Sequence, residues 1–300
     1  MPELDELSAP PVVRSGDLLP LSVIIGVRNE ALNLPRCLES LREIGEIFVV
    51  DSQSTDETVE IARSFGANVV QFHYRGGWPK KRQWAVDSLP FAYDWILLLD
   101  ADESLTPALL TEIKAAIQDS RYDGYHIALR IYFLGRELRH SGASFRKLAL
   151  FRRGAGHYEC RLREQDASMA DMEVHEHVVV EGRTRCLQSP LLHHNVRSLS
   201  HYIRKHDAYS NWEANVWLNG STNELGPSLV GTQAQRRRWL RRNFFALPGS
   251  PLAFFLYKYV LRLGFLDGIP GLIYCCFQGI QFFHIKAKIY ELQHAPEAER

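Results

Sequence analysis

Apolar and polar positions alternate with two different periods along the first 120 residues of the chain. Short apolar runs rich in β-branched residues predict buried strands at residues 21–27, 47–50, 68–73 and 95–99. Segments with apolar residues at three- and four-residue steps, or with helix-start signals, predict helices at residues 31–44, 54–65 and 80–89 and from Thr106 onward. Strands that alternate with helices indicate an α/β fold with a mostly parallel sheet.

Beyond Gly124 the regular alternation of predicted strands and helices ends. Strand-like runs at residues 125–134 and 145–151 are separated by glycines, which predicts a mixed second half of the sheet. From Ser198 a long helical period runs to about Leu218. We therefore expect an N-terminal tail at residues 1–19, an α/β domain at 20–195 and a C-terminal helical region at 196–300.

The run WILLLDADE, residues 95–103, places three carboxylates directly after five consecutive apolar residues. Ligands of parallel α/β sheets bind outside the carboxyl ends of the strands, so Asp100 and Asp102 lie where a ligand is expected. Two carboxylates that leave an extended chain on the same side repel each other unless a cation lies between them. Mg²⁺ or Mn²⁺ would remove this repulsion and would also bind phosphate oxygens. The plain alternative is a strand followed by a polar turn.

The turn after the first strand, GVRNEA, has no glycine fingerprint for a dinucleotide, and the chain has no phosphate loop. Backbone amides of such a turn cannot wrap a diphosphate. A sheet of this kind must hold a diphosphate by other means, and a cation bound by carboxylates is the obvious one, which favours Asp100 and Asp102 as parts of a metal–diphosphate site.

Composition places the chain among globular proteins, because 46% of its 300 residues are hydrophobic and its formal net charge is +0. The five cysteines are irregularly spaced and form no Cys-x-x-Cys pair, which indicates a reducing, cytosolic location. Residues 1–20 lack the basic and apolar pattern of a signal peptide.

Cations and aromatic residues are mixed in the C-terminal region. Residues 225–266 contain no acidic residue but seven cations, namely Arg236, Arg237, Arg238, Arg241, Arg242, Lys258 and Arg262. This mixture is typical of a segment that lies on an anionic membrane surface. Charged residues, Pro270 and Gly271 interrupt the apolar stretch 252–283, which favours lying on the membrane over crossing it. The alternative is a basic helix packed on the α/β domain. No nucleic-acid motif accompanies these cations, so we expect no nucleic-acid partner.

A histidine- and glutamate-rich stretch precedes the β-branched run 178–180. Glu173 or Glu176 could serve as a general base, with His175 and His177 as orienting or diphosphate-contacting groups. Alternatives are a solvated strand face and a zinc site formed with His193 and His194, although His-x-His alone is a weak zinc motif.

Five motifs, SVIIGVRNE, VVDSQSTDET, KKRQ, LLLDADE and EVHEHV, occur in the order seen in family 2 glycosyltransferases. FLGRELRHSG, VHEHVVVEG and LRLGFLDGIPGLIY resemble a bacterial subgroup related to lipopolysaccharide core β-glucosyltransferases, so the resemblance covers about residues 20–290. It implies the nucleotide-sugar-binding fold called GT-A and a direct displacement that inverts the sugar.

By motif match, the resemblance implies a role for each candidate residue. Asp51 would contact the base of a UDP-sugar donor, Glu30 would lie near the uridine and Asp100 would contact the ribose. Asp102 would hold Mg²⁺ or Mn²⁺, Lys81 and Arg82 would contact the nucleotide or diphosphate, and His175 would lie beside the donor. Glu176 would be the catalytic base, with Glu173 as its rival. The expected acceptor is a saccharide or lipid-linked saccharide of the bacterial cell surface, met at the inner face of the cell membrane.

Two other classes stay open from the sequence. A sugar-nucleotide pyrophosphorylase could use a similar sheet, but it would need a glycine-rich basic loop that GVRNEA lacks. A catalytically silent, membrane-bound scaffold that binds sugar nucleotides would keep the fold and would not need Asp102 or Glu176.

Overall fold

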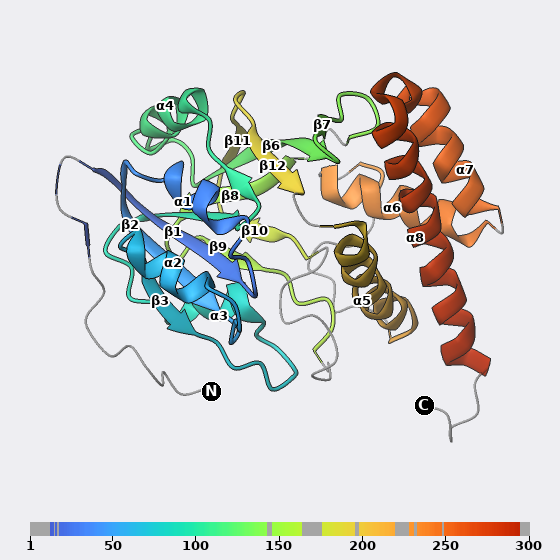
Figure 1. The fold of residues 1–300 in the computed structure, drawn as a ribbon, viewed down its shortest axis with the longest axis horizontal. Helices are drawn as coiled ribbons and strands as arrows, with labels where there is room; N and C mark the ends of the chain where they lie inside the picture. The colour runs from blue at the N-terminus through green and yellow to red at the C-terminus, as the bar shows by residue number, and fades with distance from the viewer. Residues whose placement is uncertain are drawn as a thin grey trace.

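A ten-stranded mixed sheet organises the α/β part of the chain in this computed structural model (Figure 1). The structure describes residues 13–14, 16, 18–142, 146–163, 176–195, 198–219, 228–230, 233–247 and 249–294. Four neighbouring strands are parallel, in the order β3 (Asn68–Gln71), β2 (Ile44–Asp51), β1 (Leu19–Val27) and β4 (Trp95–Asp100). The expected parallel first half is therefore confirmed.

The second half of the sheet is mixed, as expected. Strand β8 (Arg146–Arg152) runs antiparallel to both β4 and β6 (Gly124–Phe133). The remaining strands extend from β6 and are β12 (Leu191–Asn195), β5 (Glu103–Ser104), β11 (Thr184–Cys186) and β7 (Arg136–Glu137). A separate two-stranded sheet pairs β9 (Gly156–Tyr158) with β10 (Val178–Val180).

Both faces of the parallel strands are buried, which explains their continuous apolar runs. Val23 and Ile25 of β1 belong to one core cluster, whereas Ile24 belongs to the cluster on the other face. The helices of this part of the chain are α1 (Leu34–Glu39), α2 (Thr58–Ser64), α3 (Lys81–Ser88) and α4 (Pro107–Ala116).

Two helices are shorter than their sequence patterns predict. The first ends at Glu39, because Leu41 lies in a turn and Ile44 already pairs with Leu19 as the start of β2. The second begins at Thr58 instead of Ser54, because the Ser54 hydroxyl donates to Asp51 and the Asp56 carboxylate accepts from the Thr58 amide. Tertiary pairing and local side-chain hydrogen bonds outweigh the helical period at both places.

The C-terminal region is helical and lies beside the sheet (Figure 1). Its elements are α5 (Leu199–Asn219), α6 (Gln233–Ala246), α7 (Ser250–Leu256), a π-helical turn (Tyr257–Leu261), a 3₁₀ turn (Gly264–Asp267) and α8 (Gly268–His294). Within the described residues, no single helix is both long and apolar enough to cross a bilayer. The segments Ser250–Leu261 and Gly264–His294 meet that test only together, with a bend of 71° between them.

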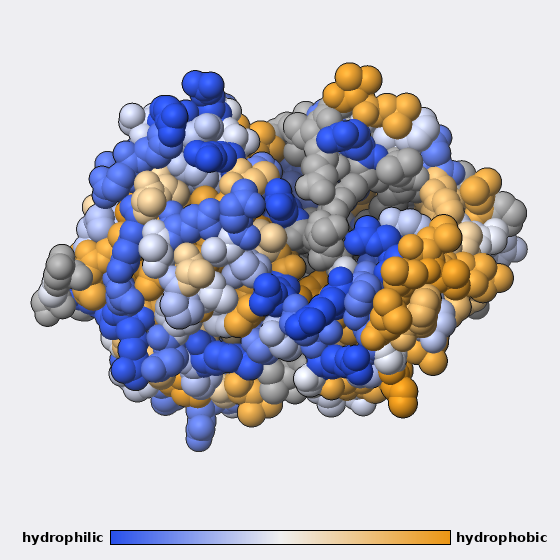
Figure 2. All heavy atoms as spheres, turned by 90° about the horizontal axis from the view of Figure 1, so that it is seen from above, coloured by the Kyte–Doolittle hydropathy of each residue, from blue (hydrophilic) through white to orange (hydrophobic). Residues whose placement is uncertain are grey.

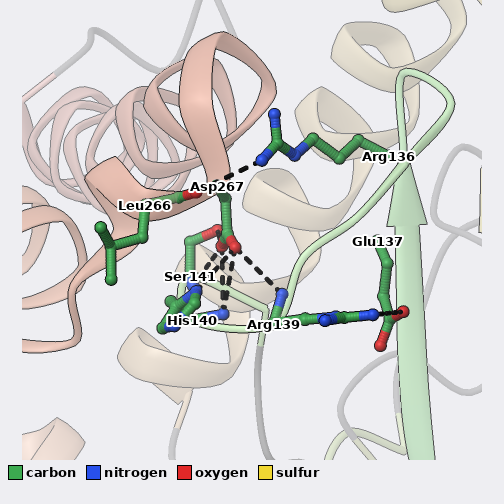
Figure 3. Close-up of polar contacts among 7 residues, drawn as sticks. All are labelled: Arg136, Glu137, Arg139, His140, Ser141, Leu266 and Asp267. Carbon is green, nitrogen blue, oxygen red and sulfur yellow. Dashed lines mark hydrogen bonds and ion pairs between the residues drawn. The ribbon is translucent and has the colours of Figure 1, made fainter.

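Asp267, the last residue of the 3₁₀ turn that follows the bend, fastens the helical region to the sheet (Figure 3). Its carboxylate accepts hydrogen bonds from the backbone amides of Arg139, His140 and Ser141 and from the Ser141 hydroxyl. These residues follow β7, and the guanidinium of Arg136 on the same strand donates to the Leu266 carbonyl. We call Asp267 and residues 139–141 the Asp267 clamp. Burial raises the pKa of Asp267, but the hydrogen bonds outweigh this effect and hold it below its ordinary value.

Hydrophobic surface gathers over the C-terminal helices (Figure 2). Leu261 and Ile269, on either side of the bend, are 74% and 73% exposed. Other large apolar side chains exposed nearby are Leu252, Leu256, Val260, Leu263, Phe265 and Leu266. We call this set the apolar elbow.

Candidate active site

A cavity of about 260 Å³ lies between the carboxyl edge of the sheet and the C-terminal helices. Glu30, Asp100, Asp102 and His193 line it from the sheet side, and residues of α5 and α8 line it from the helical side. Of the predicted site residues, the structure therefore brings Glu30, Asp100 and Asp102 together at one cavity. Its position outside the ends of β1 and β4 agrees with the ligand site of open α/β sheets.

Asp100 forms ion pairs with two cations. The Arg82 guanidinium contacts its Oδ1 atom, and the Lys147 Nζ atom lies 3.9 Å from its Oδ2 atom. The antiparallel register explains Lys147, because Leu97 pairs with Leu150 and three further steps along each strand bring Asp100 beside Lys147. Arg82 was predicted as a site residue, and Lys147 was missed.

Glu103 is fully buried behind Asp100. Its carboxylate accepts a hydrogen bond of 2.9 Å from the Asp100 backbone amide and pairs with Lys147. Burial lowers the pKa of Lys147, and its pairing with Glu103 opposes this effect without overcoming it. The third carboxylate of the DADE run therefore supports Asp100 from within the protein.

Asp102 faces the cavity, and its surroundings favour the ionised form. Its Oδ1 atom lies 3.5 Å from the His193 Nδ1 atom, and its carbonyl accepts a hydrogen bond of 2.8 Å from the His194 amide. Burial raises the pKa of Asp102, but His193, Lys205 and Lys147 together hold it below its ordinary value. A charged carboxylate is thus presented to whatever enters the cavity.

The donor set fits a divalent metal of the Mg²⁺ or Mn²⁺ kind. These ions need only one or two protein carboxylates and complete their coordination with water and phosphate oxygens, and Asp102 is such a carboxylate at a cavity. Among the described residues, no three His, Cys, Asp or Glu side chains are grouped as a metal cluster. The zinc alternative therefore gains no support from His177, His193 and His194, and His175 lies outside the described residues.

Glu30 and Asp51 follow β1 and β2, but only Glu30 lines the cavity. The Glu30 carboxylate accepts a hydrogen bond of 2.8 Å from Asn33, which fixes its direction. Asp51 is fully buried and accepts hydrogen bonds from the Ser54 amide and from Gln71 at 3.0 and 2.9 Å. These contacts hold Asp51 at the strand end, and its contact with a base stays a prediction.

Lys81 is fully buried at the start of α3, and its side chain reaches the end of β1. Its Nζ atom donates a hydrogen bond of 2.8 Å to the carbonyl of Val27, the last residue of β1. The helix thus delivers Lys81 to the end of β1 and Arg82 to the end of β4. Contact of either residue with a diphosphate stays a prediction.

Glu176 is buried and does not belong to the described lining of the cavity. Its Oε2 atom lies 3.3 Å from the Lys80 Nζ atom, and its Oε1 atom accepts a hydrogen bond of 3.4 Å from the Arg161 amide. Lys80 in turn lies 4.9 Å from the ring centroid of Trp212 on α5. The acid that was expected to be the base is therefore held by a cation; its rival Glu173 lies outside the described residues.

Arg238 corrects one expectation about the basic C-terminal segment. It was expected at a membrane surface, but its guanidinium makes two hydrogen bonds with the carboxylate of Glu159, which is fully buried. The same carboxylate accepts a hydrogen bond of 2.9 Å from the His177 amide, next to Glu176. For Arg238, the alternative of a helix packed on the α/β domain is right.

Several site residues gave no usable sequence signal. Lys80 could have been suspected from its place beside Lys81. Lys147 reaches Asp100 and Glu103 only through strand register, and Lys205 reaches the cavity only through the packing of α5. No local pattern of residues encodes such distant neighbours.

Comparison with known proteins shows the family of the chain. The family described as glycosyl transferase family 2 matches residues 22–178, more than half of the chain. The chain belongs to this family. The resemblance inferred from the motifs is thereby confirmed, and the matched region includes both acids at the end of β4.

Two bacterial glycosyltransferases are among the curated relatives of this family 2 glycosyltransferase. A lipopolysaccharide core biosynthesis glycosyltransferase, LpsC of Rhizobium meliloti, is 29% identical over 93% of this chain and 95% of its own length. An uncharacterised glycosyltransferase of Rickettsia felis is 30% identical over 65% of this chain and 69% of its own length. A solved structure of S. aureus TarS, residues 1–349 with UDP-GlcNAc, is 14% identical over 92% of each chain, with a TM-score of 0.47.

Proposed function

We propose that the protein is an inverting hexosyltransferase with a GT-A fold that takes its sugar from a UDP-sugar. Its acceptor is a saccharide or lipid-linked saccharide in the synthesis of bacterial surface polysaccharide or lipopolysaccharide. The observation that carries this proposal is the pair Asp100 and Asp102, which ends a buried parallel strand at a cavity. The lipopolysaccharide relative supports the class of acceptor.

On this proposal the donor binds across the ends of β1, β2 and β4. Asp51 and Glu30 contact the uridine, and Asp100 contacts the ribose. Lys81, Arg82 and His175 lie toward the diphosphate. Because Asp51, Lys81 and Arg82 are held by strand and helix contacts, the donor would meet a preorganised surface and lose little free energy in ordering it.

Asp102 is the residue that would hold Mg²⁺ or Mn²⁺, with water and the diphosphate as its other ligands. When bound, the ion supplies charge stabilisation to the departing diphosphate. Without it, the diphosphate would face the carboxylates of Asp100 and Asp102 directly. Binding of a nucleoside diphosphate should therefore require the cation.

Transfer needs a base for the acceptor hydroxyl, and we assign this role to Glu176. The hydroxyl oxygen forms a bond to the anomeric carbon while the bond from that carbon to the diphosphate breaks, and the proton passes to the Glu176 carboxylate. Attack from the face opposite the diphosphate inverts the sugar. Lys80, 3.3 Å from Glu176, compensates the negative charge of the buried carboxylate in the ground state.

We further propose that the enzyme is cytoplasmic and peripheral to the inner face of the cell membrane. The apolar elbow supports this location, since contiguous exposed apolar side chains mark interaction surfaces. Exposed Arg236 and Arg262 supply positive charge for anionic lipids. Arg238 is excluded from this role by its pairing with Glu159.

Titration calorimetry and a transfer assay test the proposal together. Purified protein is titrated with UDP, GDP and dTDP with and without Mn²⁺, and a panel of nucleotide sugars is screened for transfer. We expect UDP to bind with Mn²⁺ and to lose its affinity in chelator or in Asp102→Ala. Equal binding of all three nucleotides with and without chelator would refute the metal bridge.

A further inference from the structure

The helical wall of the cavity carries a cation that faces the acidic wall. Glu30, Asp100 and Asp102 form the sheet side, and Lys205 on α5 belongs to the opposite side together with Tyr202, Tyr209 and Tyr274. The ring centroid of Tyr209 lies 5.9 Å from the Lys205 Nζ atom. Tyr209, Asp102 and Glu30 raise the pKa of Lys205, against the opposing effect of burial, so the ammonium is charged at neutral pH.

Packing of α5 holds Lys205 in place. Residues 201, 205 and 209 share one face of the helix, since they are four residues apart. Tyr202 packs against Phe133 of β6 and Tyr274 against the same ring, with centroid distances of 5.4 and 5.6 Å. About two turns beyond Lys205, Trp212 is fully buried, with its ring centroid 4.9 Å from the Lys80 Nζ atom. The helix is thus anchored on both sides of Lys205.

The chemistry of the two walls points to a phosphate group between them. A neutral sugar hydroxyl does not need a fixed positive charge, whereas a phosphate facing carboxylates needs cations on the sides that the metal does not cover. The other cations at the sheet edge are already engaged, because Arg82 and Lys147 pair with Asp100 and Glu103. Among the described residues that line the cavity, Lys205 is the one lysine or arginine that the helical region adds.

We propose that Lys205 is a phosphate-binding residue that contacts the donor diphosphate or a phosphate carried by the acceptor. The proposal rests on the glycosyl-transfer function and adds that α5 completes the site, so residues 20–195 alone form only one wall. As the glycosyl bond breaks, the diphosphate gains negative charge, and a fixed ammonium stabilises that charge without reorganisation. A lysine acts here as a point charge, which tolerates either phosphate source.

Calorimetry on the full chain measures the contact without relying on turnover. The nucleoside diphosphate that binds the wild type with Mn²⁺ is compared with its monophosphate and its nucleoside. We expect Lys205→Met to weaken diphosphate binding about 10- to 100-fold, the effect of one lost charged hydrogen bond, and to leave nucleoside binding unchanged. Lys205→Arg should keep most of the affinity. Arg204→Met, on the exposed side of the same helix, is the matched control.

The outcomes separate this proposal from the function on which it rests. Wild type that binds no nucleoside diphosphate refutes the proposed function. Wild-type binding that Lys205→Met leaves unchanged, with a raised KM for a phosphorylated acceptor but not for its dephosphorylated form, assigns Lys205 to the acceptor phosphate. No change in either measurement overturns the proposal. Lys205→Gln replaces Lys205→Met if the methionine variant does not fold.

Discussion

The cavity edge and the Asp267 clamp each contain an aspartate with a lowered pKa, half-buried in the case of Asp102 and buried in the case of Asp267, but they hold its charge in different ways. At the clamp, three backbone amides and a hydroxyl donate to Asp267, so its hydrogen-bonding capacity is used within the protein. At the cavity edge, the charge of Asp102 is balanced mainly through space by His193, Lys205 and Lys147. A lowered pKa therefore does not mark a functional carboxylate by itself. The direction of the acceptor atoms, toward a cavity or toward backbone amides, makes the distinction.

The largest expected effects come from removing the proposed catalytic base and the proposed metal ligand, and both changes leave the Asp267 clamp intact. Glu176→Gln keeps the shape of the side chain but cannot accept a proton, so transfer should fall by about 10²- to 10⁴-fold while donor affinity is retained. Asp102→Asn should lose both transfer and donor binding. Single-turnover transfer and UDP-sugar titration measure the two effects separately.

Glu173→Gln is the control for the assignment of the base. Near-normal transfer by Glu176→Gln, together with a large loss in Glu173→Gln, would move the base to the rival glutamate. Melting temperatures close to the wild-type value for Glu176→Gln would show that the loss is chemical and not a loss of fold.

The next largest effect is a fall in the free energy of unfolding when the Asp267 clamp is removed. Asp267→Ala leaves the backbone amides of residues 139–141 without the carboxylate that accepts their hydrogen bonds. The free energy of unfolding should therefore fall by about 3 kcal/mol. Urea titration followed by circular dichroism measures the change. Asp207→Ala is the control, because its carboxylate pairs with Lys288 at an exposed position and should cost below about 1 kcal/mol.

The pH dependence of this effect has a definite sign. The folded-state pKa of Asp267 lies below its unfolded value of about 3.9, so its stabilising contribution is present at neutral pH. It is lost as pH falls below about 4 and through the folded-state pKa. The stability difference between wild type and Asp267→Asn should therefore shrink on acidification. A difference that grows with falling pH would contradict the assignment.

Sequence reasoning succeeded where a residue's place follows from its own strand. The apolar run before Asp100 fixed the strand, and the strand fixed the edge at which Asp100, Asp102 and Glu30 lie. It failed where a contact joins distant elements. Arg238 and Arg236 are two residues apart in one basic run, yet one binds buried Glu159 and the other is exposed. Composition describes both in the same way, and only the packing of α6 separates them.

A smaller loss of stability should distinguish the half-buried arginine Arg238 from the exposed arginine Arg236. Arg238→Met leaves the buried Glu159 carboxylate with fewer donors, so the free energy of unfolding should fall by about 2 kcal/mol. Transfer should fall too, since Glu159 also holds the His177 amide beside Glu176. Arg236→Gln, two residues away and exposed, should leave stability within about 0.5 kcal/mol of wild type. Equal stability of the two variants in thermal melts would refute the buried pair.

The smallest effect tests the membrane surface of the helical region. Arg236→Gln and Arg262→Gln each remove an exposed cation, worth about 1 kcal/mol or roughly fivefold in partition to anionic vesicles. The electrostatic contribution to vesicle binding should weaken with salt, because exposed charges are screened over about 8 Å at physiological ionic strength.

Leu261→Ser in the apolar elbow should weaken binding to neutral and anionic vesicles alike, since it removes exposed apolar area. Arg121→Gln on the α/β part is the control for loss of one positive charge. Co-sedimentation that shows no vesicle binding by wild type, or equal binding by all variants, would make the elbow a surface for another partner.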